Sequence, residues 1–150
     1  MTKKGEPTKV SWTNACENAF IKLKSFLKSR LVLRPPNWDN LFILQVDASD
    51  FGVGAILSQL DEEGLEHPVV FTSRKLQPRE MKLSTTEKEC LAIVWAVETF
   101  RYYLFGRRFK LQTDHNPLVW LNQVKNKNRK LLRWSLTLQE YDIEHKTGDM

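Results

Sequence analysis

Three carboxylates in this 150-residue chain lie where a metal ion could bind. Asp47 ends an apolar run at 41–46, and Asp114 ends a second run at 109–113. A carboxylate at the end of a strand lies at the rim of a sheet, where α/β proteins bind their ligands. If the two strands are parallel neighbours, the carboxylates converge, and they repel each other unless a cation lies between them. Oxygen ligands of this kind favour Mg²⁺ or Mn²⁺.

The third carboxylate, Glu89, is expected on an apolar helix face that it shares with Ile93. A carboxylate on such a face is costly unless it is paired or bound to metal. Each candidate also has an ordinary explanation. Asp47 and Asp114 are common turn formers after a strand, and Glu89 gains from the dipole at the start of its helix. Glu87, on the same turn, is a rival that a capping role explains.

The elements that would position these carboxylates follow from apolar periodicity, glycine and proline. An amphipathic helix is predicted over 13–27, and Pro35 and Pro36 separate it from the rest of the chain. Three strands joined by short turns predict an antiparallel meander, and the helix after them predicts parallel pairing of the fourth strand. The first strand is typical of a central strand covered on both faces. The expected strands cover 41–47, 52–60, 67–73, 109–113 and 141–145, and the later helices cover 84–103, 117–122 and 129–140.

Composition and charge limit the class of protein to which the chain can belong. Hydrophobic residues make up 41% of the chain, which suits a globular core and excludes a disordered chain. No apolar run is long enough to span a bilayer, and residues 1–10 lack the apolar segment of a secretory signal. The net charge of +5 is compatible with nucleic-acid binding but is not specific to it. Cys16 and Cys90 lack metal-ligand spacing, so we expect reduced core thiols in an intracellular protein.

Five blocks of sequence together carry a specific resemblance. They are VDASDFGVGAILSQ at 46–59, FTSRKL at 71–76, EKECLAIV at 87–94, YLFG at 103–106 and TDHNPL at 113–118. In order and spacing they resemble the ribonuclease H domain of gypsy-class LTR retrotransposon polyproteins, over a stretch from about Trp12 to Met150. The resemblance implies an α/β, ribonuclease H-like fold, a mixed five-stranded sheet with flanking helices. It also implies cleavage of the RNA strand of RNA–DNA hybrids by part of a reverse transcriptase.

The resemblance carries over to the candidate site residue by residue. Asp47, Glu89 and Asp114 match the family's catalytic, metal-binding carboxylates, which implies two Mg²⁺ or Mn²⁺ ions and two-metal hydrolysis. Glu89 is preferred to Glu87 because the family glutamate directly precedes the apolar block that begins at Cys90.

Nucleic-acid contacts are expected from two groups of residues. The first group has four residues. Thr85, Thr86 and Asn116 match positions that contact the hybrid in relatives, and Ser49 lies in the first of the five blocks. A dense basic run would contact phosphates without reading sequence, although it could also be an ordinary solvated helix face. This run consists of Lys125, Lys127, Arg129, Lys130 and Arg133.

One feature of the family has no match here. The family carries a fourth aspartate on a final helix, beyond the position of His145. Because the chain stops at Met150, we expect that helix to be missing and activity to be weak. His145 is an auxiliary candidate, since some relatives have a mobile histidine there, but an ordinary surface histidine at a strand end explains it as well.

Domain organisation and partners follow from the same resemblance. Residues 1–36 are expected to be a tail and a helix, at 12–31, that link to a polymerase region, and residues 37–150 a C-terminally truncated ribonuclease H-like domain. The expected partners are an RNA–DNA hybrid and the polymerase domain of the same polyprotein, with no membrane. The expected location is intracellular, in a cytoplasmic retroelement particle or the nucleus, and not secreted.

Two alternatives remain open. One is a truncated or domesticated module that binds nucleic acid with weak or no catalysis. The other is an integrase or transposase core, which needs its glutamate on a helix after the second aspartate. In this chain Glu89 lies between Asp47 and Asp114, so this second alternative ranks low.

Overall fold

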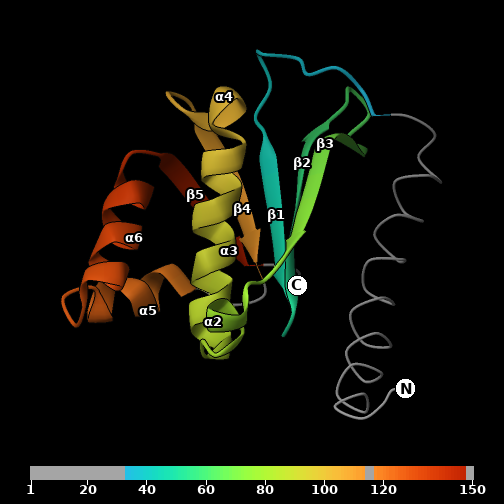
Figure 1. Cartoon of the computed structure of the whole chain (residues 1–150). Coiled ribbons are helices and arrows are strands. Elements are labelled where there is room, and N and C mark those ends of the chain that lie inside the picture. Colours follow the sequence, from blue (N-terminus) through green and yellow to red (C-terminus); the bar gives the residue numbers. More distant parts are fainter. Residues whose placement is uncertain (1–32, 114–116, 148–150) are drawn as a thin grey trace, which may run out of the picture.

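The computed structural model describes residues 33–113 and 117–147, which form a sheet with helices packed against it (Figure 1). The helix expected over 13–27 lies outside the described residues, as do Cys16, Asp114 and Asn116. The elements are β1 (Ile43–Ala48), β2 (Gly52–Leu60), β3 (Glu66–Lys75), α2 (Pro78–Met81), α3 (Thr85–Thr99), α4 (Arg101–Leu104), β4 (Arg108–Thr113), α5 (Pro117–Val124), α6 (Arg129–Gln139) and β5 (Asp142–Thr147).

The five strands lie in the order β3-β2-β1-β4-β5. β1 pairs with β2 and β2 with β3 in antiparallel fashion, whereas β4 is parallel to both β1 and β5. The predicted meander and the predicted parallel pairing of the fourth strand are therefore confirmed. β1 is the central strand, so its carboxyl end at Ala48 lies between the beginning of β2, which is antiparallel, and the carboxyl end of β4, which is parallel.

The hydrophobic core lies between the sheet and α3. Phe42 and Leu44 are fully buried there, and helices α3, α5 and α6 lie on the same side of the sheet (Figure 1). Leu44 of β1 is buried, whereas Ile43 and Gln45 on the opposite face are half-buried and Asp47 is exposed. The prediction that the strand is covered on both faces stays a prediction, because residues 1–32 lie outside the described part of the chain.

The helix expected over 84–103 is two helices. α3 ends at Thr99, and the next residue, Phe100, leaves helical geometry with φ −99° and ψ 23° before α4 begins at Arg101. The ring of Phe100 is 2% exposed, so it is anchored in the core at the break. Gly106 follows α4 with a φ of +84° and permits the turn into β4.

The short helix α2 was not expected, and it begins at Pro78, a residue that suits the first helical position. Within the described part of the chain, no helix is both long and apolar enough to cross a membrane.

Candidate metal and nucleic-acid site

Asp47 lies at the carboxyl end of the central strand. Its partner on the neighbouring strand β2 is Gly54, which has no side chain next to the carboxylate. On the other side β1 is parallel to β4 in a register that pairs Gln45 with Gln112, and the two side-chain amides are hydrogen-bonded at 3.3 Å. Asp47 is exposed, so its oxygens can reach a ligand at the sheet rim.

Glu89 is carried to the same rim by α3. Ser84 caps this helix, since its hydroxyl accepts from the backbone N–H of Glu87 at 3.2 Å. The buried residues after Glu89, including Ala92 and Ile93, press the helix onto the sheet. Glu89 itself is half-buried, on the side of the first turns that faces the sheet end.

The two carboxylates line one small recess of about 30 Å³. A site of this size has room for one or two particles as large as a water molecule. Besides Asp47 and Glu89 it is lined by Val46, Ala48, Ala92, Ile93 and Thr113. The structure therefore brings together two residues that are 42 positions apart in the sequence.

The recess supplies oxygen donors, which suit Mg²⁺ or Mn²⁺. The third expected ligand, Asp114, lies outside the described residues, directly after the recess-lining Thr113. Among the residues that the structure describes, no group of three or more His, Cys, Asp or Glu side chains could hold a metal ion. The donor set observed in the recess is thus a pair of carboxylates beside a threonine.

Glu87 has a structural role that separates it from Glu89. One carboxylate oxygen accepts from the backbone N–H of Ser84 at 3.0 Å, and the other accepts from Lys130 at 3.2 Å. The Ser84 amide, followed by Lys130, holds the pKa of Glu87 below its usual range. The capping role predicted for Glu87 is confirmed, and it also ties α6 to the start of α3.

His145 lies beside the recess. It is half-buried within β5, and its Nε2 is 3.0 Å from the hydroxyl of Thr113 on β4. His145 is not at the strand end as expected, because β5 continues to Thr147 and the parallel pairing with β4 places His145 opposite Leu111. Its place beside a recess-lining residue follows from this pairing.

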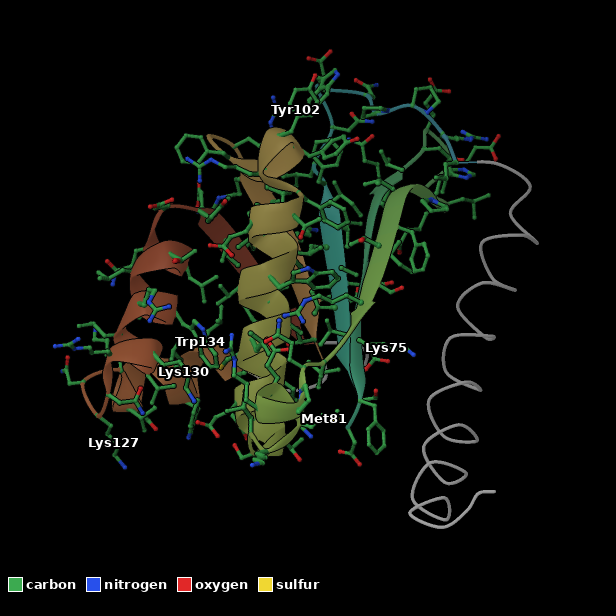
Figure 2. The ribbon with its side chains drawn as sticks, in the orientation of Figure 1. Lys75, Met81, Tyr102, Lys127, Lys130 and Trp134 are labelled. Carbon is green, nitrogen blue, oxygen red and sulfur yellow. The ribbon has the colours of Figure 1, made fainter. Side chains whose placement is uncertain are left out.

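The basic run surrounds the junction between α5 and α6. Figure 2 shows Lys127 and Lys130 at the same end of the molecule as Met81, just before α3, and Tyr102 at the opposite end. Lys130 forms an ion pair with Glu87, and its Nζ lies 5.3 Å from the centre of the Trp134 ring. The remaining members differ in exposure. Lys127, Arg129 and Arg133 are exposed, and Lys125 is half-buried.

The other expected nucleic-acid contacts have different surroundings. Thr85 is exposed and Thr86 half-buried at the start of α3. The hydroxyl of Ser49 accepts from the backbone N–H groups of Phe51 and Gly52 at 3.3 and 3.0 Å, so it shapes the turn after β1.

Two residues at this end of the sheet were not singled out in the sequence as site candidates. Thr113 lines the recess, and its place just before Asp114 was the available signal. Lys88 precedes Glu89 and is only 7% exposed. The sequence feature that could have pointed to Lys88 is its charge, which lies next to the apolar stretch at the centre of the helix.

The residue after Glu89, Cys90, is a free thiol in the main hydrophobic core. It is fully buried, and its Sγ donates to the backbone carbonyl of Pro117 at 3.4 Å. Burial raises the pKa of this thiol to about 12. The prediction of a reduced core thiol is confirmed for Cys90, whereas Cys16 lies outside the described residues.

Sequence comparisons relate the chain to retroelement proteins. Residues 37–141 match the family model described as "RNase H-like domain found in reverse transcriptase". The chain is 44% identical over 126 residues to the retrovirus-related Pol polyprotein from transposon 297 of Drosophila melanogaster, covering 84% of this chain and 11% of that protein. It is 40% identical over 143 residues to the corresponding polyprotein from transposon 412, covering 95% of this chain and 11% of the relative.

A more distant relative is the transposon Tf2-3 polyprotein of Schizosaccharomyces pombe, 35% identical over 137 residues that cover 89% of this chain and 10% of that protein. The chain thus spans about a tenth of the length of the curated relatives it matches.

Solved structures share the fold at low identity. A foamy viral protease-reverse transcriptase in complex with dsDNA superposes with a TM-score of 0.67 at 14% identity, covering 93% of this chain and 30% of that chain. The same type of protein in complex with an RNA/DNA hybrid gives a TM-score of 0.62 at 14% identity, covering 79% of this chain and 16% of that chain.

Proposed function

The chain belongs to the family of RNase H-like domains found in reverse transcriptases, and from this premise we propose that it hydrolyses the RNA strand of RNA–DNA hybrids. Its relatives are retroelement polyproteins, and its fold is RNase H-like. The observation that carries the proposal is the recess at the end of β1, where Asp47 and Glu89 lie together. Carboxylates converging at a strand end are the feature that metal-assisted phosphodiester cleavage needs.

Asp114 is proposed as the third ligand. Asp47 follows Gln45 by two residues, Asp114 follows Gln112 by two, and Gln45 is paired with Gln112 across the parallel strands. Parallel strands that keep their register place equivalent positions side by side. The equal spacing of Asp47 from Gln45 and of Asp114 from Gln112 supports Asp114 as a neighbour of Asp47. The position of Thr113 in the wall of the recess supports it as well.

The chain's own residues would do three things at such a site. Asp47 and Glu89 would hold divalent cations by charge, and the apolar side chains of Val46 and Ile93 would close the back of the recess. When bound, two Mg²⁺ or Mn²⁺ ions would supply activation of water and neutralisation of charge at the scissile phosphate. The exposure of Asp47 leaves the front of the site open to a phosphodiester backbone.

Substrate binding is proposed to use the basic end of the molecule. Lys127 and the other exposed basic residues of the α5–α6 junction lie at the end where α3 begins, as do Thr85 and Thr86 (Figure 2). Such side chains contact phosphates without reading sequence. A related structure was solved with an RNA/DNA hybrid, which supports the same substrate class here. The RNA strand would be distinguished by its 2′-hydroxyls.

The chain is proposed to act within a polyprotein. Residues 1–36 would link it to a polymerase region, and residues 37–150 would form the RNase H-like domain. The family match, which begins at residue 37, supports this division. The curated relatives, of which the chain spans about a tenth, support a polymerase partner in the same polyprotein.

Cleavage of a labelled duplex tests the proposal. The full chain is incubated in Mg²⁺ and separately in Mn²⁺ with an RNA–DNA hybrid, and with RNA–RNA and DNA–DNA duplexes of the same sequence. We expect cuts in the RNA of the hybrid alone, leaving 5′-phosphates, and no cuts in EDTA. Binding of the hybrid without cleavage in either metal would contradict the proposal and favour a non-catalytic nucleic-acid-binding module.

A further inference from the structure

A buried lysine adjacent to Glu89 has no part in the function proposed above. Lys88 is 7% exposed, and it is the one buried charged side chain among the residues that the structure describes. Burying an ammonium group is costly unless it is paired. The position of Lys88 therefore depends on the groups that its side chain reaches.

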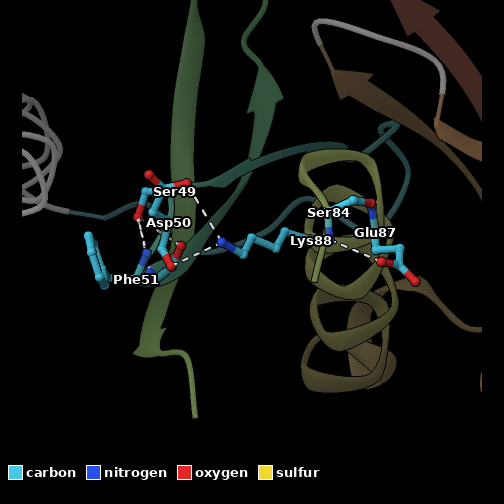
Figure 3. A network of polar contacts seen from close by, with 7 residues as sticks. Ser49, Asp50, Phe51, Ser84, Glu87 and Lys88 are labelled. Carbon is cyan, nitrogen blue, oxygen red and sulfur yellow. Dashed lines mark hydrogen bonds and ion pairs between the residues drawn. The ribbon is translucent and has the colours of Figure 1, made fainter. Parts of the chain in front are cut away.

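Those groups belong to the turn after β1. The Nζ of Lys88 donates to the backbone carbonyl of Asp50 at 3.3 Å and lies 3.6 Å from its carboxylate oxygen Oδ1. Figure 3 shows the side chain crossing from α3 to this turn. Because the side chain of Asp50 is 82% exposed, its carboxylate stays hydrated, and the carbonyl is the shorter contact. Lys88 thus ties the first turns of α3 to the main chain that follows Asp47.

Several hydrogen bonds hold the turn at the far end of this contact. The backbone N–H of Ser49 donates to the carbonyl of Gly52 at 2.8 Å, and the Ser49 hydroxyl accepts from the N–H groups of Phe51 and Gly52. The N–H of Leu76, just beyond β3, donates to the carbonyl of Phe51 at 2.8 Å. A tie to this turn therefore also fixes the end of β1.

We propose that Lys88 is a positioning residue that holds Glu89 against the end of β1, so that the recess keeps the spacing at which Asp47 and Glu89 share cations. This inference rests on the proposed metal-dependent function. Two carboxylates that line one recess repel each other before a cation arrives, and the tie through Lys88 opposes their separation without any metal. Groups that lie outside a metal's own ligand set but orient its ligands tune metal affinity in proteins.

The inference separates metal affinity from stability. Methionine is close to lysine in length and removes the cost of burying an ammonium group, and the carboxylate left behind on Asp50 is solvated because its side chain is 82% exposed. Lys88→Met is therefore expected to fold with an unchanged urea midpoint, whereas its affinity for Mn²⁺ falls by about tenfold. Lys88→Arg keeps the charge and should stay within about threefold of the wild type.

The experiment is a calorimetric titration of the metal-free full chain with Mn²⁺, without nucleic acid. The matched control is Arg74→Met, which removes an ion pair to Glu80 at 2.9 Å outside the recess. It should lose stability and keep the Mn²⁺ affinity. With hybrid present, kcat of Lys88→Met should fall while KM stays constant, because the buried side chain does not reach substrate.

Each outcome decides one question. Equal Mn²⁺ affinities for Lys88→Met and the wild type would overturn the positioning role and leave the proposed function intact. A wild type that binds no Mn²⁺ would overturn the proposed function itself. If Lys88→Met loses its native circular dichroism, Lys88→Gln takes its place with the same expected loss. As a second readout, the amides of Phe51 and Gly52 should exchange faster when Lys88 is replaced, and unchanged exchange would count against the tie.

Discussion

At the residue scale, Glu87 and Glu89 are two positions apart on α3 and have different tasks. Glu87 accepts from the Ser84 backbone and pairs with Lys130, so both of its oxygens serve the fold. Glu89 lines the recess that it shares with Asp47. The two side chains therefore offer a test in which stability and activity should move independently.

We expect Glu87→Ala to lower the free energy of unfolding by about 1 kcal/mol, because the capping box is lost, with hybrid cleavage largely retained. Glu89→Gln should keep the stability and reduce cleavage by at least about 100-fold, the upper end of losses seen when only a supporting group is removed. Urea unfolding and initial cleavage rates measure both effects. If instead Glu87→Ala were inactive and Glu89→Gln active, Glu87 would be the candidate metal ligand and Glu89 the structural residue.

Much of the candidate site could be predicted at this scale. Strand ends and the family blocks pointed to Asp47 and Glu89, and the structure brings both into one recess. Asp114 stays a prediction, because it lies outside the described residues. Lys88 was missed because its partner, Asp50, is 38 positions away, and apolar periodicity carries no information on such a contact. The surroundings of His145 likewise depend on the pairing of β5 with β4.

At the scale of elements, the connection from α3 to β4 depends on two residues. Phe100 breaks the helix, and Gly106 turns the chain with a φ of +84°. A Cβ built on Gly106 would meet no atom within 4 Å, so a side chain there is opposed by backbone conformation alone.

Gly106→Ala should therefore lower the free energy of unfolding by about 1 to 2 kcal/mol, the usual penalty of a left-handed conformation. Gly106→Asn should lose less, since asparagine tolerates this region better. Thermal unfolding followed by circular dichroism compares the three proteins. An alanine variant as stable as the wild type would show that the turn relaxes into another conformation.

A paired carboxylate joins α2 to the end of β3. Glu80 accepts two hydrogen bonds from Arg74, at 2.9 and 3.0 Å, and this contact holds the pKa of Glu80 below its usual range. Because the folded pKa is lower than the unfolded one, the contribution to stability is present above about pH 4.5. It is lost as the pH falls through the folded pKa.

Wild type should thus lose about 1 kcal/mol more stability than Glu80→Gln between pH 6 and pH 3. Urea midpoints at both pH values for the two proteins give this difference. Parallel losses in the two proteins would show that another group accounts for the acid sensitivity.

Element order was more predictable than element boundaries. The strand runs and their turns predicted the meander and the parallel fourth strand, because hydrophobic pattern and connection length act locally. The break at Phe100 was not visible, since the apolar pattern continues through it. The four-residue helix α2 was missed because it is too short to show a helical period.

At the scale of the whole molecule, the candidate carboxylates and the exposed basic residues lie at one end. Lys127 marks this end in Figure 2, and Tyr102 marks the other. The carboxyl ends of β1 and β4 lie at the same edge of the sheet because the two strands are parallel, and Figure 1 shows this edge at the end of the molecule where α3 begins. A duplex lying across this end would meet phosphate contacts and the recess together.

Replacing Lys127, Arg129 and Arg133 together by glutamine should weaken hybrid binding and lower the slope of log K against log salt by about 2 to 3. The Mn²⁺ affinity should not change. Arg108→Gln, at the start of β4 and 57% exposed, is the control and should leave the slope unchanged. Fluorescence anisotropy over a salt series measures the slopes. Identical slopes for the triple variant and the wild type would remove the basic run from the binding surface.

The central claim is that the carboxylate recess performs the chemistry. Its most direct test is the rate of hybrid cleavage by the wild type beside Asp47→Asn, in Mg²⁺, with equal stability of the two proteins verified by urea unfolding. Asparagine keeps the size of the side chain and removes its negative charge, so we predict measurable cleavage by the wild type and essentially none by the variant. Equal rates in the two proteins would contradict the assignment of the recess as the active site.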